Sequence, residues 1–356
     1  MNNRIEDAIS GVYTLDMVYS IDMKHKRIFI VGGAGFLGYH ASLELANRGA
    51  EVTALALPDE LVDESLSSRV NIARANIDEL SDEQLTELLS GYDSLVYAAG
   101  PDDRVELAPG VKANEFFQTQ LVERTERVLR IAKASGVHKV IVYGSYFSYI
   151  NSHGVCGVPT GSLERHPYIK ARVEQTRRAF ALGDDSFSVA VLNIPYVFGT
   201  APGKTPIWKS IFVDRFADSP KIYYGNGGTT AISAKKIAVL TAQALDLAKH
   251  GDELPIGSRD MKLKPMIEQL LSAANINKSV GSLPNWLLSM GMKSQWKKSQ
   301  KADLDFGLDL RYLNDDILRR DFFVDFAATD TKLQVDYDDD VDEAIRETGK
   351  FMSGDV

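Results

Sequence analysis

From residue 27 to about residue 200, short apolar runs alternate with longer segments whose apolar residues recur at helical spacing. The runs predict strands at 27–31, 52–57, 70–77, 94–99, 139–145 and 189–193. The segments between them predict helices at 36–48, 82–90 and 115–135, and one that begins at Pro167. Because the runs lack alternating polar positions, we expect helices on both faces of the strands. The pattern predicts an α/β fold with a doubly wound parallel sheet.

The pattern changes after Gly199, where glycine, proline, tryptophan and basic residues are concentrated. Helical periodicity then dominates, with only short strands between the helices. The sequence predicts helices at 233–249, 264–274, 285–300 and 342–351. We therefore expect a smaller, mainly helical cap in the C-terminal part of the chain.

Three glycines, Gly32, Gly35 and Gly38, stand between the first predicted strand and the first predicted helix, with Phe36 and Leu37 inside the motif. The first glycine permits a tight turn, the second lets backbone approach a pyrophosphate, and the third lets the helix pack closely on the strand. The helix N-terminus then faces the anion. In this context the motif predicts a Rossmann-like domain that binds NAD or NADP through these residues.

These observations divide the chain unequally. We expect an NAD(P)-binding domain at 23–200, with further sheet and helix returning to it from about 220–258. Residues 201–356 are expected to form a smaller, discontinuous substrate-binding domain. Residues 1–22 are interpreted as an N-terminal extension, because Met23 leads directly into the first strand.

The end of the second strand bears on the choice between NAD and NADP. An acidic residue there would bind the ribose 2′-hydroxyl of NAD, and a basic one would bind the 2′-phosphate of NADP. The strand ends Leu-Ala-Leu-Pro at 55–58, with neither. Asp59 and Glu60 follow, and their charge opposes a 2′-phosphate, so NAD is preferred over NADP.

Composition narrows the function classes. The chain has 356 residues and 40 Lys plus Arg against 49 Asp plus Glu, a net charge of −9, which argues against nucleic-acid binding. No apolar run approaches the roughly 18–20 residues that span a membrane. Cys156 is the only cysteine, so no intrachain disulfide forms and a cytoplasmic location is expected. No metal site is expected, because histidines such as His153 lack companion ligands at suitable spacing.

Several segments occur in the order of a known family. They are the glycine motif, the strand end Ala98-Ala99-Gly100, the segment 143–149, the helix start at Tyr168 and the segment 192–199. Together they resemble the extended short-chain dehydrogenase/reductases, the NAD-dependent epimerase/dehydratase group, over about residues 26–200. The resemblance implies further cofactor contacts from Ala98, Ala99, Gly100, Tyr143, Pro195, Tyr196 and Val197.

The resemblance also implies a catalytic set. In this family a serine or threonine, a tyrosine and a lysine transfer the proton that accompanies hydride transfer. The matching positions are Ser145, Tyr168 and Arg172, so arginine replaces the family lysine. Helical spacing places Arg172, and not Lys170, on the face of Tyr168. A cation there lowers the pKa of a tyrosine, but arginine is planar and is not interchangeable with lysine.

Two further departures indicate an atypical branch. Asn193 stands where the family usually has an arginine, and Leu121 stands where many members have an asparagine. The resemblance also implies a homodimer that forms through the helices expected at 115–135 and 167–182.

Substrate contacts are less clearly indicated by the sequence. The loop from 149 to 166 is expected over the mouth of the site, with Asn151, His153 and His166 as polar candidates and His166 the best placed. Lys204 and Trp208 combine a cation and an aromatic ring, which suits an anionic or sugar-like ligand; the alternative is a solvated helix start anchored by Trp208.

Three functions remain open at this stage. The leading hypothesis is an NAD(P)-dependent oxidoreductase or epimerase that acts on a secondary alcohol or ketone, with a sugar nucleotide among its candidate small-molecule substrates. One alternative is a non-catalytic dinucleotide-binding regulator or scaffold, and another is a reductase of a small or hydrophobic ketone.

Overall fold

A computed structural model describes residues 23–353 of the chain, and the expected extension at 1–22 lies outside these residues. Its central element is a seven-stranded sheet with the order β10-β6-β5-β4-β1-β2-β3, and every neighbouring pair in it is parallel. Its strands are β1 Arg27–Val31, β2 Glu51–Ala56, β3 Asn71–Arg74, β4 Ser94–Tyr97, β5 Lys139–Ser145, β6 Ser188–Ile194 and β10 Glu253–Pro255. The Rossmann-like α/β fold expected from the sequence is confirmed.

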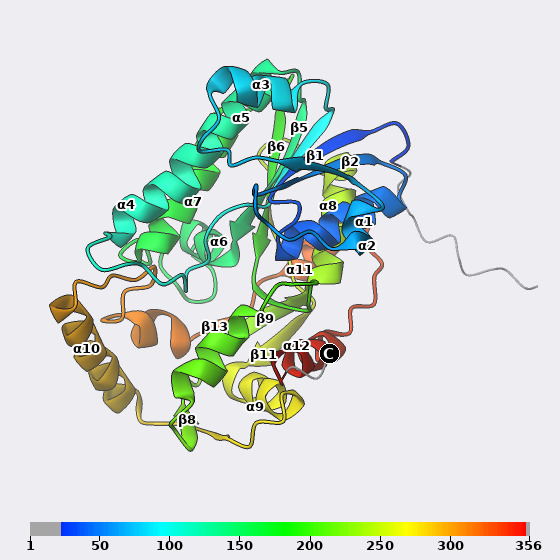
Figure 1. The fold of residues 1–356 in the computed structure, drawn as a ribbon. Helices are drawn as coiled ribbons and strands as arrows, with labels where there is room; N and C mark the ends of the chain where they lie inside the picture. Colours follow the sequence, from blue (N-terminus) through cyan, green and yellow to red (C-terminus); the bar gives the residue numbers. More distant parts are fainter. Residues whose placement is uncertain (1–22, 354–356) are drawn as a thin grey trace, which may run out of the picture.

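Helices cover both faces of this sheet (Figure 1). Their bounds are α1 Phe36–Asn47, α8 Ala234–Leu247, α3 Asp82–Leu89, α5 Arg124–Ala134 and α7 Pro167–Ala181. Ile28 and Ile30 of β1 pack toward α1 and α8, whereas Phe29 and Val31 pack toward α3 and α5. Alternate strand residues therefore enter two separate cores, which explains why the apolar runs lack polar positions.

The C-terminal part forms a layer beyond the carboxyl ends of the main strands, in the lower half of Figure 1. A second sheet joins β11 Arg259–Lys262, β9 Gly228–Ser233, β13 Asp321–Phe322 and β7 Tyr196–Phe198, and a short pair joins β8 Lys221–Tyr223 to β12 Ser279–Gly281. The helices are α9 Leu263–Ala273, α10 Asn285–Lys301, α11 Phe326–Lys332 and α12 Val341–Ser353. All four helices expected after residue 230 are present within a few residues of their predicted bounds.

Local differences from the expected elements occur near the sheet edge where β5 ends. The expected loop after residue 149 begins as a helix, α6 Tyr146–His153, which follows β5 without a connecting loop. The helix expected at 115–135 is α4 Ala113–Phe117, a π-helical turn Gln118–Glu123 and α5. Short additional helices, α2 Glu64–Ser67 and the turns between 209 and 216, were not expected.

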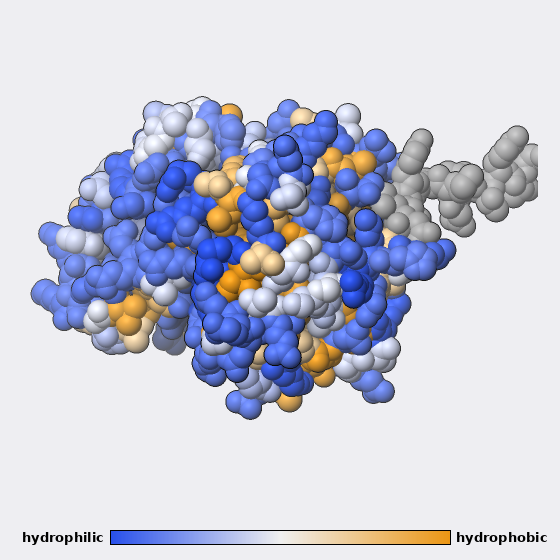
Figure 2. Space-filling view, turned by 90° about the horizontal axis from the view of Figure 1, so that it is seen from above, coloured by the Kyte–Doolittle hydropathy of each residue, from blue (hydrophilic) through white to orange (hydrophobic). Residues whose placement is uncertain are grey.

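No helix among residues 23–353 has both the length and the apolar character needed to span a bilayer. On the face seen in Figure 2 hydrophilic residues predominate, and hydrophobic side chains appear in small clusters between them.

A buried ion pair attaches the C-terminal segment to the sheet domain. Lys236 of α8 is 4% exposed, and its Nζ donates to Asp330 Oδ2 at 2.7 Å and to the Gly257 carbonyl at 2.9 Å. Burial raises the pKa of Asp330, and Lys236 acts in the opposite direction. Removal of the lysine would leave a half-buried carboxylate and a carbonyl without this donor.

We predict that Lys236→Met lowers the free energy of unfolding by about 3 kcal/mol, because it leaves one partner of a buried pair uncompensated. Chemical denaturation monitored by circular dichroism measures the change. Lys235→Met is the control, since Lys235 pairs with Glu347 at the surface, where an ion pair contributes about 1 kcal/mol or less. Equal effects of the two substitutions would contradict this role.

Candidate active site

A cavity of 590 Å³ lies at the carboxyl ends of the parallel strands, where β1 pairs with β4 on one side and β2 on the other. This is the point at which successive crossovers leave in opposite directions, and it is where doubly wound sheets bind ligands. The cavity extends from Leu57, after β2, to Tyr168 on α7 and Trp208 in the cap. One continuous cavity thus joins the glycine motif to the expected catalytic residues.

The glycine motif forms the floor of this cavity. Gly32 has φ +79°, a conformation that favours glycine, and a Cβ on Gly38 would lie 2.0 Å from the Gly32 carbonyl oxygen. Helix α1 begins after Gly35, and no side chain caps its first amide groups. Phe36 and Leu37, the first two residues of the helix, line the cavity. A close helix–strand contact and an uncapped helix N-terminus fit the pyrophosphate of a dinucleotide.

The turn after β2 closes the far end of the cavity. Glu60 folds back so that its Oε2 accepts from the Leu57 amide at 3.0 Å, while its Oε1 pairs with Lys204 from the cap. Arg74 holds the turn through three carbonyls, including that of Glu60 at 2.8 Å. An acidic residue therefore lines the adenosine end, although the strand itself ends without one.

The three residues of the expected catalytic set meet on the opposite side of the cavity. Ser145 ends β5 and caps α6, and its Oγ accepts from the Phe147 amide at 3.3 Å. Tyr168 lies in the first turn of α7, after Pro167, and is 5% exposed. The Nε of Arg172, one turn later, donates to the Tyr168 hydroxyl oxygen at 3.1 Å.

Arg172 is held in place by acceptors on three sides. Its Nη1 donates to the Tyr143 carbonyl at 3.0 Å and to Gln175 Oε1 at 2.9 Å, and its Nη2 reaches the Pro101 carbonyl at 3.5 Å. Gln175 is fixed in turn by donating to Thr125 Oγ1 at 2.8 Å. The acceptors therefore match the directions of the N–H groups of the planar guanidinium. A lysine ammonium, which is a single compact donor group, could not reach all of them at once.

Several opposing effects act on Tyr168. Burial raises the pKa of its phenol most strongly, and Asp103 and Asp102 raise it further. Arg172 lowers that pKa, as does hydrogen bonding with Ser145. The phenol is therefore protonated around neutral pH in this arrangement, and Arg172 is the main group that makes its ionised form accessible.

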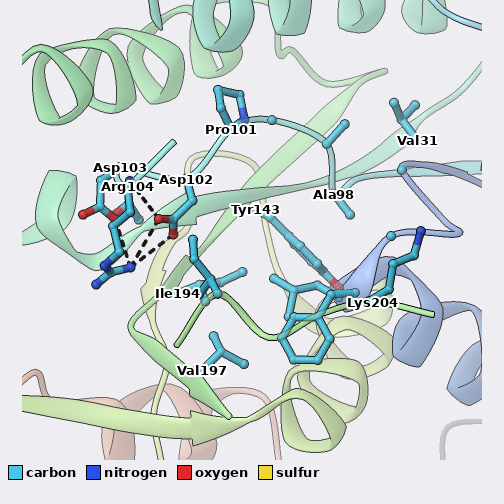
Figure 3. A pocket seen from close by; sticks show the side chains of 18 of the residues that line it. Val31, Ala98, Pro101, Asp102, Asp103, Arg104, Tyr143, Ile194, Val197 and Lys204 are labelled. Atoms are coloured by element: carbon cyan, nitrogen blue, oxygen red, sulfur yellow. Dashed lines mark hydrogen bonds and ion pairs between the residues drawn. The ribbon is translucent and has the colours of Figure 1, made fainter. Parts of the chain in front are cut away.

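The sequence analysis missed a charged cluster after β4. Arg104 Nη1 lies 3.3 Å from both carboxylate oxygens of Asp102 and 3.2 Å from Asp103 Oδ1. The guanidinium carbon also lies 4.8 Å from the ring centre of Tyr196 and 5.1 Å from that of Trp208. Burial raises the pKa of Asp103 to about 7, although Arg104 acts in the opposite direction. In Figure 3 this cluster lies across the pocket from Lys204.

A segment of the cap supports this part of the site from behind. The Tyr168 amide donates to the Gly307 carbonyl at 2.9 Å. A Cβ on Gly307 would lie 2.6 Å from the Asp103 carbonyl and 2.9 Å from the Phe117 ring. The absence of a side chain at 307 therefore allows the cap to contact both the Tyr168 helix and the Asp103 loop.

The structure brings most of the expected site residues to this cavity. Its lining includes Gly32, Gly35, Phe36, Leu37, Ala98, Ala99, Gly100, Tyr143, Ser145, Tyr168, Arg172, Pro195, Tyr196, Val197, Lys204 and Trp208. Gly38 lies beneath the floor in contact with Gly32. Leu121 packs against Gly100, and Asn193 is fully buried outside the lining.

The expected substrate contact of His166 is not seen and is corrected here. His166 is fully buried outside the cavity lining, where its Nε2 lies 3.0 Å from Asp316 and its Nδ1 accepts from the Asp309 amide. It is the N-cap residue of α7, directly before Pro167, and it does not line the cavity. Asn151 and His153 also lie outside the lining, and His153 contacts Glu253.

Residues 28–230 match the NAD dependent epimerase/dehydratase family. The chain belongs to this family. The chain is also similar to a curated protein from Dictyostelium discoideum, sterol-4-alpha-carboxylate 3-dehydrogenase, decarboxylating, with 29% identity over 131 residues. That match covers 36% of this chain and 36% of the relative, so the chain spans about a third of the relative's length.

Solved structures of epimerases share the fold of this family member. A nucleoside-diphosphate-sugar epimerase from Pseudomonas aeruginosa superposes with a TM-score of 0.69 at 13% identity, covering 93% of this chain and 98% of the other. A UDP-glucuronic acid 4-epimerase from Bacillus cereus, in complex with UDP-glucuronic acid and NAD, has a TM-score of 0.67 at 16% identity over 93% and 100%. At these identities the likeness establishes the fold. The description of the matching family model names NAD dependence for the family.

We predict that Gly38→Ala weakens NADH binding at least about tenfold and lowers the free energy of unfolding by about 2 kcal/mol, because α1 must move off β1. Fluorescence titration with NADH and thermal unfolding measure the two effects. Gly291→Ala in α10 is the control: nothing lies within 4 Å of its Cβ, so the helix should gain slightly in stability. Normal NADH binding by Gly38→Ala would exclude this packing role.

Proposed function

We propose that the protein is an NAD(P)-dependent oxidoreductase that interconverts a secondary alcohol and a ketone. The observation that carries this proposal is the meeting of Ser145, Tyr168 and Arg172 on the cavity that also contains the glycine motif. A regulator that only binds the dinucleotide would need the glycine motif but not these three residues. It would give no reason for a buried tyrosine to face the cavity beside a fixed cation.

Each residue has a distinct chemical role. The bound nicotinamide supplies the hydride acceptor or donor. Tyr168 takes the proton from the substrate hydroxyl in oxidation and returns it to the ketone oxygen in reduction. Ser145 Oγ accepts from the Phe147 amide, so its own hydroxyl hydrogen can be donated either to the Tyr168 oxygen or to the substrate oxygen. Arg172 stabilises the Tyr168 phenolate.

The protonation state favours one direction at neutral pH. Burial raises the pKa of Tyr168, so the phenol carries the proton that ketone reduction needs. Oxidation needs the ionised form, which becomes more abundant as pH rises. We therefore expect reduction to be supported near neutral pH and oxidation to increase under alkaline conditions.

The substrate end of the cavity favours a neutral substrate with an apolar surface. Its walls include Tyr146, Phe147, Ile207 and Trp208. Among the described lining residues, each lysine or arginine already contacts a protein partner: Arg104 with Asp102 and Asp103, Arg124 with Asp78, Arg172 with Tyr168, and Lys204 with Glu60. A second anionic ligand beside the dinucleotide would have to displace one of these pairs.

The name of the curated relative refers to a sterol carboxylate. Its largely apolar ring system agrees with the apolar walls of the cavity, whereas its carboxylate is a charge that the proposed neutral substrate lacks. A sugar nucleotide is the second candidate. It is favoured by the structural neighbours whose complexes contain UDP-sugars and whose chains are covered almost completely.

We predict that a panel of neutral secondary alcohols and ketones, run beside UDP-sugars and monitored by nicotinamide absorbance, yields turnover that Tyr168→Phe lowers by about 10²- to 10⁴-fold. NADH binding should be retained, because the ring stays in place. Tyr149→Phe is the control, since Tyr149 lies outside the cavity lining. Unchanged turnover in Tyr168→Phe would remove this residue from the mechanism.

We also predict a change in pH dependence when the cation is removed. Arg172 lowers the pKa of Tyr168, so Arg172→Met raises that pKa and moves the rise of the oxidation rate to higher pH, by about 1–3 units. Arg172→Lys keeps the charge and should show a smaller displacement. The pH profile of kcat/KM with the substrate from the panel measures both. A profile that does not move in Arg172→Met would show that the arginine has no electrostatic effect on the base.

A further inference from the structure

The Glu60–Lys204 pair joins two segments that are far apart in the chain. Residues 199–208, which we call the strap, leave β7 and run along the cavity to Trp208, and most of them line it. Both partners are partly buried, with 26% of the Lys204 side chain and 19% of the Glu60 side chain exposed. The pair therefore connects the cap to the turn after β2 at the adenosine end of the cavity.

Hydrogen bonds to other parts of the protein fix both ends of the strap. At its start the Gly199 amide donates to Thr348 Oγ1 at 2.8 Å, and His40 Nε2 lies 2.8 Å from the Thr200 carbonyl. At its end the Trp208 indole donates to the Val197 carbonyl at 2.8 Å. Between these anchors a tight turn through Gly203, at φ +70°, places Lys204 opposite Ala201, directly after the tip of the turn.

The position of the pair relates it to the dinucleotide. A pyrophosphate on the glycine motif places the adenosine ribose at the end of β2, next to Glu60. Oε2 of Glu60 is held by the Leu57 amide, so the carboxylate is fixed where a ribose hydroxyl would donate to it. Lys204 neutralises this carboxylate from the strap side. A ribose 2′-phosphate at this place would have to compete with Glu60 for Lys204, and displacing the lysine would expose it to the Glu60 charge.

We propose that the Glu60–Lys204 pair holds the strap over the adenosine half of the bound dinucleotide and selects NAD against NADP. This inference rests on the proposed function, because it requires a dinucleotide in the cavity. Breaking the pair has two separate consequences. The dinucleotide escapes faster because the strap opens, and a freed Lys204 becomes available to a 2′-phosphate.

Binding measurements test this without a known substrate. Quenching of protein fluorescence gives the affinities of the full-length protein for NADH and NADPH, and stopped-flow displacement gives the dissociation rate of NADH. Lys204→Met should raise that rate about fivefold, the effect of losing one partly exposed ion pair. Glu60→Gln keeps the acceptor for the Leu57 amide while it removes the charge, and it should tighten NADPH binding about tenfold.

The double variant gives the decisive comparison. If the tighter NADPH binding of Glu60→Gln comes from the freed lysine, it should vanish when Lys204→Met is added. NADH dissociation should be no faster in the double variant than in Glu60→Gln, because the pair is already broken. Lys209→Met is the matched control: Lys209 lies just beyond the strap and pairs with Asp214 at 2.7 Å, outside the cavity lining.

The outcomes separate this inference from the proposed function. If the unaltered protein binds neither NADH nor NADPH, the proposed function itself fails. If it binds NADH and Lys204→Met releases NADH at the original rate, the strap role is overturned. If the NADPH gain of Glu60→Gln persists in the double variant, the selectivity role of Lys204 is overturned.

Discussion

The close packing of α1 on β1 is the constraint on which the rest of the site depends. It exists because Gly38 has no side chain between its backbone and the Gly32 carbonyl. This contact sets the helix N-terminus over the edge of the sheet, and the position of the pyrophosphate follows from it. Glu60 and Tyr168, which line the two ends of the cavity, then lie on opposite sides of the glycine motif.

At the end of the cavity near Tyr168, the charge of Arg104 is balanced by carboxylates within the protein, whereas that of Arg172 is not. Arg172 is surrounded by neutral oxygen acceptors, including the Tyr143 carbonyl and Gln175, so its charge is not cancelled by a carboxylate. It can therefore act on Tyr168. Arg104, in contrast, is paired with two carboxylates and lies against two aromatic rings. The two arginines thus differ in their effect on the cavity, because Arg104 is bound by carboxylates and Arg172 by neutral oxygens.

Features encoded in local sequence could be predicted. Each strand, the glycine motif and the Tyr168–Arg172 spacing depends only on residues close together in the sequence. The fold and the position of the cavity at the ends of the strands could therefore be predicted from the sequence pattern. The helix α6 was missed because Ser145 ends a strand and caps a helix at the same residue. His166 was misplaced because a position beside Tyr168 in sequence says nothing about which way its ring turns.

Features that depend on distant segments could not be predicted. Lys204 meets Glu60 across 144 positions, and Gly307 contacts Tyr168 from the cap. Neither pairing leaves a periodic signal, and a charged residue in a loop is usually solvated. The Asp102–Arg104 cluster matches no motif. Three consecutive charged residues a few positions after the end of the buried strand β4 were nevertheless a signal that could have been followed.

The hydrogen bond from the Tyr168 amide to Gly307 has a consequence for how such proteins diversify. The first turn of the helix that carries Tyr168 is completed by a carbonyl from the C-terminal part of the chain. Exchange of the C-terminal part between relatives would therefore also replace a group that supports the Tyr168 helix. A chimera would retain a well-placed tyrosine only if the incoming cap supplied an equivalent carbonyl and equally little bulk beside the Asp103 loop.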